Sequence, residues 1–559
     1  MTLRLALAQI NPTVGDLDGN ASRIVAFSRE ARHAGADLVL FPEMALTGYP
    51  PEDLLFEPLF LAKTGKSLRA LLRSVPKDLL VVVGSPTKKG HSLYNAAFVL
   101  YGGRFRHSFH KWFLPNYGVF DEQRYFSEGE KPAVLDLNGV RIGLTICEDI
   151  WRPKGPALAA AEQGASLLLN LSASPYHAGK IKERLGVLRN KTRECGSAIA
   201  YCNMVGGQDE LVYDGGSLVM DRKGNVVAQA PMFKEKLLLV DMALPKARGR
   251  AAEPAISSGR KERPPLPAIM ETPLSRENEI YSALTLGTRD YVQKNGFGKV
   301  VIGLSGGIDS ALVATIAVDA LGKENVVGVT LPSRFNSTET KADAEGVAKN
   351  LGIDFLTIGI EETVQAYIKT LAPLFAGRAV DVTEENLQSR VRGTLLMALS
   401  NKFGWLVLTT GNKSELSAGY FTLYGDSVGG FSVIKDIPKT VVYDLAQWRN
   451  NRDKRPVIPG TTITRAPSAE LRRHQKDQDT LPPYDVLDAI IAHHVEENHG
   501  LAEIVKNGIE PGVAAKTLRT IDAMEYKRRQ APLGVKITPR AFGRDRRMPI
   551  TNRFRPYDS

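Results

Sequence analysis

Short apolar runs and amphipathic stretches alternate along the first 245 residues of the chain. The apolar runs have the length of β-strands and predict strands at 3–10, 37–41, 79–84, 95–100, 140–146, 166–171, 198–204, 217–220 and 237–241. Apolar residues at helical spacing predict helices at 20–34, ending before Gly35, and at 180–195. The turn sequence at 221–225 predicts a hairpin. The pattern favours an α/β domain with a mixed sheet.

A regular alternation of helices and strands follows in the second half. A helix is predicted at 277–294, strands at 300–304, 325–331, 354–358 and 405–409, and further helices at 308–321, 337–351, 360–375 and 387–402. Such alternation is typical of a doubly wound parallel sheet, which binds its ligands at the carboxyl ends of the strands.

Between these regions the periodicity is lost. Residues 246–275 are rich in proline, glycine and basic side chains, and we expect a solvated linker there. The predicted domains are therefore 1–245 and 276–559, because 559 residues exceed a single ordinary core.

Composition adds three constraints. The 72 lysines and arginines exceed the 61 acidic residues, and the net charge of +11 suits phosphate-bearing ligands or nucleic acid without choosing between them. The first residues do not form a signal peptide and no run of about 18 apolar residues occurs, so we expect a cytoplasmic protein with no membrane contact. The 3 cysteines include no CxxC pair, which predicts a reducing compartment and no structural zinc.

A glycine-rich turn joins the predicted strand at 300–304 to the next helix. Its sequence is Ser305-Gly306-Gly307-Ile308-Asp309-Ser310. Two glycines allow successive N–H groups to point at an anion, and the helix N-terminus adds its dipole. The spacing is neither that of a Walker A loop nor GxGxxG; a plain helix start capped by Ser305 is the alternative. The turn resembles the SGGxDS loop of the ATP pyrophosphatase superfamily, which implies cleavage of ATP between its α and β phosphates.

Three residues of the first half lie where strands end in polar turns. Glu43, Lys111 and Cys147 could supply a base, an electrostatic stabiliser and a nucleophile if the fold brings them together. Taken singly, the thiol is explained as a small core residue and the two charges as solvated side chains.

The sequences around these residues carry a resemblance. FPEMALTGYPPEDL, HKWFLPNYGVFDEQRYF and LTICEDIW are similar to the three catalytic motifs of the nitrilase superfamily, and LPNYGVFDE and ICEDIW to the glutaminase half of glutamine-dependent NAD synthetases. The resemblance implies an αββα sandwich in which Cys147 attacks the glutamine amide, Glu43 shuttles the proton, Lys111 holds the oxyanion and Glu122 supports them. It also places glutamine beside Tyr117, Ser174 and Lys180. For Cys195 and Cys202 we expect structural roles.

The second half resembles NAD synthetases in four stretches, ENLQSRVRGTLLMALSN, GNKSELSAGYFTLYGD, APSAELRRHQKDQDTLPPYDVLD and YKRRQAPLGVKIT. The resemblance implies a Rossmann-like ATP pyrophosphatase domain. The ATP-binding residues that it implies are Gly303, Leu304, Ser305, Gly306, Gly307, Ile308, Asp309, Ser310 and Thr410, and those for deamido-NAD are Asn386, Glu415 and Lys527. Because departing pyrophosphate gains charge, we expect Mg²⁺ at the carboxylates of Asp309 and Glu415.

The combined resemblance implies ATP-dependent amidation of deamido-NAD through an acyl adenylate, with ammonia released from glutamine and passed on within the chain. The expected partners are the small molecules glutamine, ATP and deamido-NAD, without nucleic acid, and we expect a homo-oligomer. The alternatives are a nitrilase-type amidase with a regulatory nucleotide-binding domain, an ATP pyrophosphatase that uses the basic C-terminal stretch on RNA, and a pure binding module. RNA thiolation would call for reactive cysteines, and the second half has none.

Overall fold

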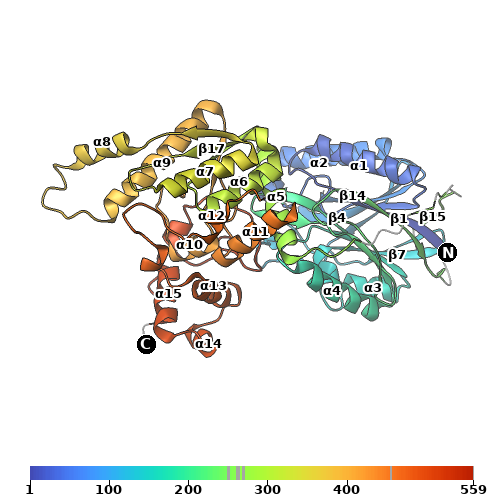
Figure 1. Cartoon of the computed structure of the whole chain (residues 1–559). Coiled ribbons are helices and arrows are strands. Elements are labelled where there is room, and N and C mark those ends of the chain that lie inside the picture. The colour runs from blue at the N-terminus through green and yellow to red at the C-terminus, as the bar shows by residue number, and fades with distance from the viewer. Residues whose placement is uncertain are drawn as a thin grey trace. The chain divides into compact units, whose positions relative to one another are not determined.

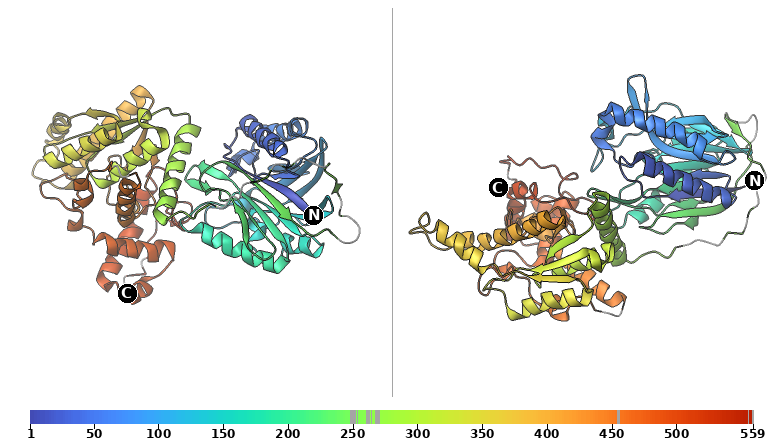
Figure 2. Two further views of the ribbon diagram at one scale, coloured as in Figure 1. Left: turned by 45° about the vertical axis from the view of Figure 1, so that its right-hand side comes forward. Right: turned by 90° about the horizontal axis from the view of Figure 1, so that it is seen from above.

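The computed structural model describes residues 1–247, 252, 254–259, 263, 265–266, 271–453, 456–554 and 556–557 (Figures 1 and 2). The chain forms two compact units, Met1–Gln208 with Val212–Leu274, and Asp209–Leu211 with Ser275–Ser559. Among the described residues, no helix combines the length and the apolar character needed to cross a membrane. Much of the predicted linker at 246–275 lies outside the described residues.

The first unit contains two large sheets. The six-stranded sheet has the order β14 (Lys236–Ala243), β1 (Thr2–Gln9), β2 (Leu38–Leu40), β3 (Leu80–Lys89), β4 (Ser92–Tyr101) and β5 (Arg104–His110). The seven-stranded sheet has the order β13 (Val226–Gln229), β12 (Leu218–Met220), β9 (Ala198–Asn203), β8 (Leu167–Ser172), β7 (Val140–Ile146), β6 (Ala133–Leu137) and β15 (Ala255–Ile256). A separate ribbon pairs β10 (Val205–Gln208) with β11 (Leu211–Asp214).

The two sheets face each other, and helices cover their outer faces. Leu5 and Leu7 of β1 pack into the core between the sheets, whereas Ala6 and Ala8 pack into a second cluster with Ile24 of α1 (Leu17–His33). This division follows from the two-residue repeat of a strand. Helix α2 (Pro58–Ser74) covers the same face as α1, and α3 (Pro156–Glu162) and α4 (Lys180–Cys195) cover the other sheet (Figure 1). The predicted αββα sandwich is confirmed.

The prediction of a solvated linker is wrong for part of its length. Ala255–Ile256 form strand β15, which pairs in parallel with β6, and Ile256 is buried. Ser258 accepts a hydrogen bond from Asn138, and Arg263 pairs with Asp37. Two residues are too few to produce a periodic pattern, so this edge strand leaves no signal in the sequence.

The second unit is built on a wholly parallel five-stranded sheet. Its order is β18 (Asp354–Thr357), β17 (Val326–Thr330), β16 (Val300–Gly303), β19 (Leu406–Thr409) and β20 (Phe431–Ser432). The chain therefore moves outward from β16 in one direction and then in the other, which creates a topological switch point at the carboxyl ends of β16 and β19.

Helices cover both faces of this sheet (Figure 2). Helices α8 (Glu361–Leu371) and α9 (Val382–Phe403) pack on one face, where Val364 and Val391 join Val301 and Val407 in one apolar cluster. Helices α6 (Ile308–Leu321) and α7 (Thr338–Leu351) lie on the other, with α5 (Arg276–Lys294) and α11 (Lys439–Arg452) beside α6. The predicted doubly wound fold is confirmed.

A small helical layer follows the sheet. Helices α13 (Tyr484–Ile491), α14 (Leu501–Lys506) and α15 (Pro511–Ala523) share an apolar cluster that includes Leu487, Ile504 and Leu518. Beyond α16 (Glu525–Arg528) the described chain has no further helix, in agreement with the lack of periodicity there.

Candidate active sites

The first candidate site is a buried cluster of opposite charges at the ends of strands. Glu43 lies just after β2, and Lys111 directly follows β5. The Lys111 Nζ atom is 2.8 Å from Oε1 of Glu43 and 2.8 Å from Oε1 of Glu122. Burial alone lowers the pKa of Lys111, but the charges of Glu122 and Glu43 outweigh burial and raise that pKa well above its ordinary value. The lysine is therefore a permanently charged group.

Cys147 begins the short turn that follows β7, and its backbone is strained. Its φ is +41°, a left-handed value that is costly for a residue with a side chain, and such strain is concentrated at functional positions. Burial raises the pKa of the Cys147 thiol, the charge of Glu43 raises it further, and Lys111 opposes them. Because the resting thiol is neutral, attack on a substrate requires a base that takes its proton, and Glu43 is a carboxylate in electrostatic contact with it.

Neighbouring polar groups hold the two glutamates in place. The Asn95 side chain donates to Oε1 of Glu43 at 2.6 Å, and the backbone N–H of Ala173 donates to Oε2 at 3.1 Å. The Tyr49 hydroxyl donates to Glu122 at 2.8 Å. Sequence reasoning did not select Asn95 or Tyr49, although Asn95 is a polar residue at the start of an apolar run.

Asp149 ties the turn of Cys147 to the segment after Lys111. One of its carboxylate oxygens accepts from the backbone N–H groups of Trp112 and Phe113 at 3.1 and 3.0 Å, and the other accepts from that of Ile146 at 2.9 Å. Burial raises the pKa of Asp149 to about 7, against the effect of these hydrogen bonds. Asp149 lies within the LTICEDIW motif but is not among the predicted site residues.

The predicted glutamine-binding residues come before and after the turn of Cys147 in the sequence, and two of them contact it or its neighbour. The Tyr117 hydroxyl donates to Glu148 at 2.8 Å, and Tyr117 is 52% exposed. The Lys180 Nζ atom lies 4.2 Å from the centroid of the Trp151 ring. Ser174 is buried, and its backbone N–H donates to Asn203 at 3.0 Å. Tyr117 and Lys180 thus contact residues of this turn or next to it, whereas Ser174 follows β8.

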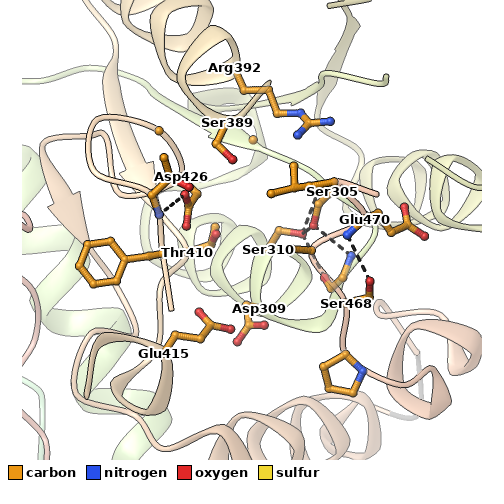
Figure 3. Close-up of a pocket in the computed structure, with 18 of the residues that line it drawn as sticks. Ser305, Asp309, Ser310, Ser389, Arg392, Thr410, Glu415, Asp426, Ser468 and Glu470 are labelled. Carbon is orange, nitrogen blue, oxygen red and sulfur yellow. Dashed lines mark hydrogen bonds between the residues drawn. The ribbon is translucent and has the colours of Figure 1, made fainter. Parts of the chain in front are cut away.

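The second candidate site is a cavity of about 880 Å³ in the second unit (Figure 3). It opens at the carboxyl ends of β16, β17 and β19, as expected for a switch point. Every residue predicted to bind ATP or deamido-NAD lines it, namely Gly303, Leu304, Ser305, Gly306, Gly307, Ile308, Asp309, Ser310, Asn386, Thr410, Glu415 and Lys527.

The glycine turn forms one wall of this cavity. Gly306 has a φ of +84°, and a Cβ atom there would come within 2.1 Å of the Thr340 carbonyl oxygen, so no other residue fits. The residue that caps α6 is Gly307 rather than Ser305, and no side chain caps that end. Instead the Ser305 hydroxyl accepts from the Gly307 N–H at 3.2 Å. The first N–H groups of α6 are therefore free to bind an anion.

Two carboxylates meet on the floor of the cavity. Asp309 accepts from Asn412 at 2.9 Å and forms an ion pair with Lys439, whose Nζ lies 3.3 Å from Oε1 of Glu415. Figure 3 shows the two carboxylates directed toward each other. The pKa of Glu415 is raised to about 8, chiefly by burial. The charge of Lys439 lowers this pKa, and that of Asp309 raises it. The side-chain oxygens of Asp309 and Glu415 are the kind of donor that Mg²⁺ prefers, and a bound cation would favour the ionised form of Glu415.

Arg392 on α9 supplies positive charge that the sequence analysis did not anticipate. It lies in the cavity wall away from Asp309 and Glu415 (Figure 3). Its side chain donates to the Leu331 carbonyl at 2.9 Å and to Asn336 at 3.1 Å, and none of the ion pairs of the described residues includes it. Burial lowers the pKa of Arg392 to about 10. A guanidinium without a carboxylate partner is suited to an anionic ligand.

The predicted deamido-NAD residues are also held by neighbouring groups of the cavity. The amide oxygen of Asn386 accepts from the Thr422 hydroxyl at 2.8 Å. The Lys527 Nζ atom donates to the carbonyl oxygens of Gly419 and Phe421 at 2.9 and 3.0 Å, and burial lowers its pKa. Both side chains are thus fixed at the cavity wall.

Comparison with known proteins finds a matching family model for each half of the chain. The family model for carbon-nitrogen hydrolase matches residues 4–251, and that for NAD synthase matches residues 280–531. The chain is 47% identical to the glutamine-dependent NAD(+) synthetase of Thermotoga maritima over 99% of both chains, and 46% identical to that of Aquifex aeolicus over 99% of this chain and 100% of the relative.

A solved structure gives the same result. The glutamine-dependent NAD+ synthetase from Acinetobacter baumannii, in complex with adenosine diphosphate, is 41% identical and superimposes with a TM-score of 0.77 over 99% of each chain. The resemblance found in the motifs is thereby confirmed. The chain belongs to the glutamine-dependent NAD(+) synthetase family.

Proposed function

We propose that the first unit releases ammonia from glutamine and that the second uses ATP to attach this ammonia to the nicotinate carboxyl group of deamido-NAD. The products are NAD, glutamate, AMP and pyrophosphate. One observation supports the assignment of the second site. Every residue predicted from the sequence to bind ATP or deamido-NAD lines a single cavity, and the glycine turn at 305–310 forms part of its wall.

In the first unit, the Cys147 thiol attacks the side-chain amide carbon of glutamine and transfers its proton to Glu43. Lys111 stabilises the negative oxygen of the tetrahedral intermediate, and Glu122 holds Lys111 in place. Collapse of the intermediate expels ammonia with the proton from Glu43 and leaves a glutamyl thioester, which water hydrolyses to glutamate. Tyr117, Ser174 and Lys180 bind the substrate.

In the second unit, a carboxylate oxygen of deamido-NAD attacks the α-phosphorus of ATP and displaces pyrophosphate. The residues from Gly303 to Ser310, with Thr410, hold ATP, and Asn386, Glu415 and Lys527 hold the dinucleotide. Asp309 and Glu415 are the residues that would hold Mg²⁺, which when bound neutralises charge on the phosphates. Ammonia then attacks the acyl adenylate and displaces AMP.

The alternative functions predict different substrate requirements. A nitrilase-type amidase with a regulatory domain would hydrolyse amides without ATP, and an RNA-modifying enzyme would consume ATP only with RNA. Assembly into a homo-oligomer remains a prediction, which light scattering of the purified chain measures.

The test is an assay with ATP, Mg²⁺, glutamine and deamido-NAD, from which each component is omitted in turn. NAD, AMP and pyrophosphate are expected only in the complete mixture, or when ammonium replaces glutamine. The Cys147→Ala variant should lose synthesis with glutamine and keep synthesis with ammonium, because the thiol belongs to the first unit only. Loss of both activities in a folded variant would refute this division of labour.

A further inference from the structure

A cluster of metal-ligating side chains lies away from the residues of either candidate site. The π-turn Ala492–Glu496 extends α13, and the three residues His493, Glu497 and His499 gather there, with ligand atoms all within 4.8 Å of one another. Oε2 of Glu497 is 2.7 Å from Nδ1 of His493 and 3.3 Å from Nδ1 of His499. None of the three lines the nucleotide cavity.

The backbone fixes this arrangement. His493 and Glu497 are four residues apart and project from the same side of the widened turn. Asn498, with a φ of +59°, then reverses the chain, so that the His499 N–H donates to the His493 carbonyl at 2.8 Å. On the other side, the His499 carbonyl lies 3.1 Å from Nδ1 of His494. Both histidines are therefore in position before any ligand binds.

One nitrogen of the cluster is left unsatisfied. Nδ1 of His499 is inaccessible to solvent and makes no hydrogen bond of acceptable geometry, although the Glu497 carboxylate is 3.3 Å away. A buried polar atom without a partner costs free energy, and a bond to a metal would remove that cost. The side chains of His493, Glu497 and His499 are 26%, 50% and 35% exposed, so the cluster lies at the surface of the unit.

We propose that His493, Glu497 and His499 form a binding site for a divalent transition-metal ion of the zinc class. Bonds of about 2.0–2.2 Å to two imidazole nitrogens and a carboxylate oxygen place neighbouring ligand atoms roughly 3.3–3.5 Å apart at a tetrahedral ion. The separations of 2.7 and 3.3 Å from Glu497 need only small changes to reach this spacing. Two imidazoles favour zinc, copper or nickel over magnesium or calcium.

The expected lack of structural zinc rests on the cysteines alone, whereas the proposed site uses two histidines and a glutamate of one short segment. A bound ion would join the π-turn to the segment that leads into α14, so it would stabilise the small layer of α13, α14 and α15.

Metal binding by the full-length, untagged chain tests the proposal. Co²⁺ is titrated in excess Mg²⁺, which keeps the carboxylates of Asp309 and Glu415 occupied by a hard cation. Imidazole and carboxylate ligands give weak visible bands, whereas binding to Cys147 would add an intense near-ultraviolet thiolate band. We expect one Co²⁺ per chain, no thiolate band, displacement by Zn²⁺, and a higher melting temperature with the metal.

His499→Ala should weaken Co²⁺ binding at least about 100-fold, since loss of a direct ligand exceeds the effect of outer-shell changes. Glu497→Gln, which keeps the side-chain shape, provides a second variant if the first fails to fold. His33→Ala removes an exposed histidine on α1 and should bind like wild type. Equal affinity of wild type and both cluster variants, a thiolate band, or no binding by wild type would overturn the proposal.

Discussion

The ammonium group of Lys111 lies 2.8 Å from the carboxylate of Glu43, and the two side chains are 0% and 1% exposed. A buried ion pair of this kind is costly to desolvate, so its value lies less in stability than in holding charges where a reaction needs them. Here it holds a base and an oxyanion partner within electrostatic reach of the Cys147 thiol.

Glu43→Gln tests the role of the base. The amide keeps the size of the side chain but cannot accept the thiol proton, so synthesis with glutamine should fall at least about 100-fold. Synthesis with ammonium should stay near the wild-type rate, and the exposed Glu30→Gln on α1 should alter neither rate. A variant that keeps full activity with glutamine would remove Glu43 from the reaction.

Asp149→Asn should impair the glutamine reaction although Asp149 itself is not proposed to touch substrate. An asparagine can offer one oxygen, whereas the backbone groups of Ile146, Trp112 and Phe113 occupy both oxygens of Asp149. One N–H group therefore loses its acceptor, and the segments carrying Cys147 and Lys111 shift. Steady-state kinetics should give a lower kcat with glutamine and unchanged kcat with ammonium; equal effects on both would indicate general unfolding.

The pH dependence of stability offers a separate test of Asp149. Its pKa is raised to about 7 in the folded state, so its protonated form stabilises the fold at low pH and that contribution is lost as pH rises through about 7. The free energy of unfolding of wild type, relative to Asp149→Asn, should fall by about 1.4 kcal/mol per pH unit between about pH 5 and pH 7 and then level off. Denaturant unfolding at several pH values measures it, and a difference that rises with pH would contradict the buried-carboxyl account.

Asp309→Asn should reduce synthesis about 100-fold or more with either nitrogen donor, because the second site serves both reactions. The Mg²⁺ concentration needed for half-maximal rate should also increase. Asp319→Asn is the matched control, since Asp319 lies on the same helix but pairs with Arg449 outside the cavity. Unchanged turnover of Asp309→Asn with ammonium would exclude Asp309 from the site.

Arg392→Met should raise the KM for ATP or deamido-NAD about 10- to 100-fold, because charge-assisted hydrogen bonds contribute about 1.5–3 kcal/mol. Because Arg392 is only partly buried and forms no ion pair with the described residues, its replacement should not cause a large loss of stability in the absence of substrate. Lys402→Met, at an exposed position of α9, is the control. Wild-type KM values for both substrates would show that Arg392 is only a structural residue.

The sequence predicts most of the fold because strand length, helical spacing and the glycine turn are local properties. It also selects Cys147 and Asp309, which stand in distinctive motifs. Asn95, Asp149 and Lys439 escape notice, because their importance lies in contacts with residues far away along the chain.

Besides long-range contacts, the burial of a side chain is a property that local sequence patterns do not reveal. Arg392 belongs to a polar-looking helix, and only the folded sheet shows that it faces a cavity instead of solvent. Strands β5 and β15 are among the strands that the sequence analysis does not predict, because β5 is strongly polar and β15 is only two residues long. Each acquires its place from pairing with a neighbouring strand.

Isotope transfer from glutamine tests the central claim most directly. The enzyme is supplied with glutamine labelled with ¹⁵N in its side-chain amide, together with ATP, Mg²⁺, deamido-NAD and a low concentration of unlabelled ammonium. The account predicts ¹⁵N in the carboxamide of NAD, with one AMP and one pyrophosphate formed for each NAD. NAD without label, or glutamine hydrolysis accompanied by neither AMP nor NAD, would contradict it.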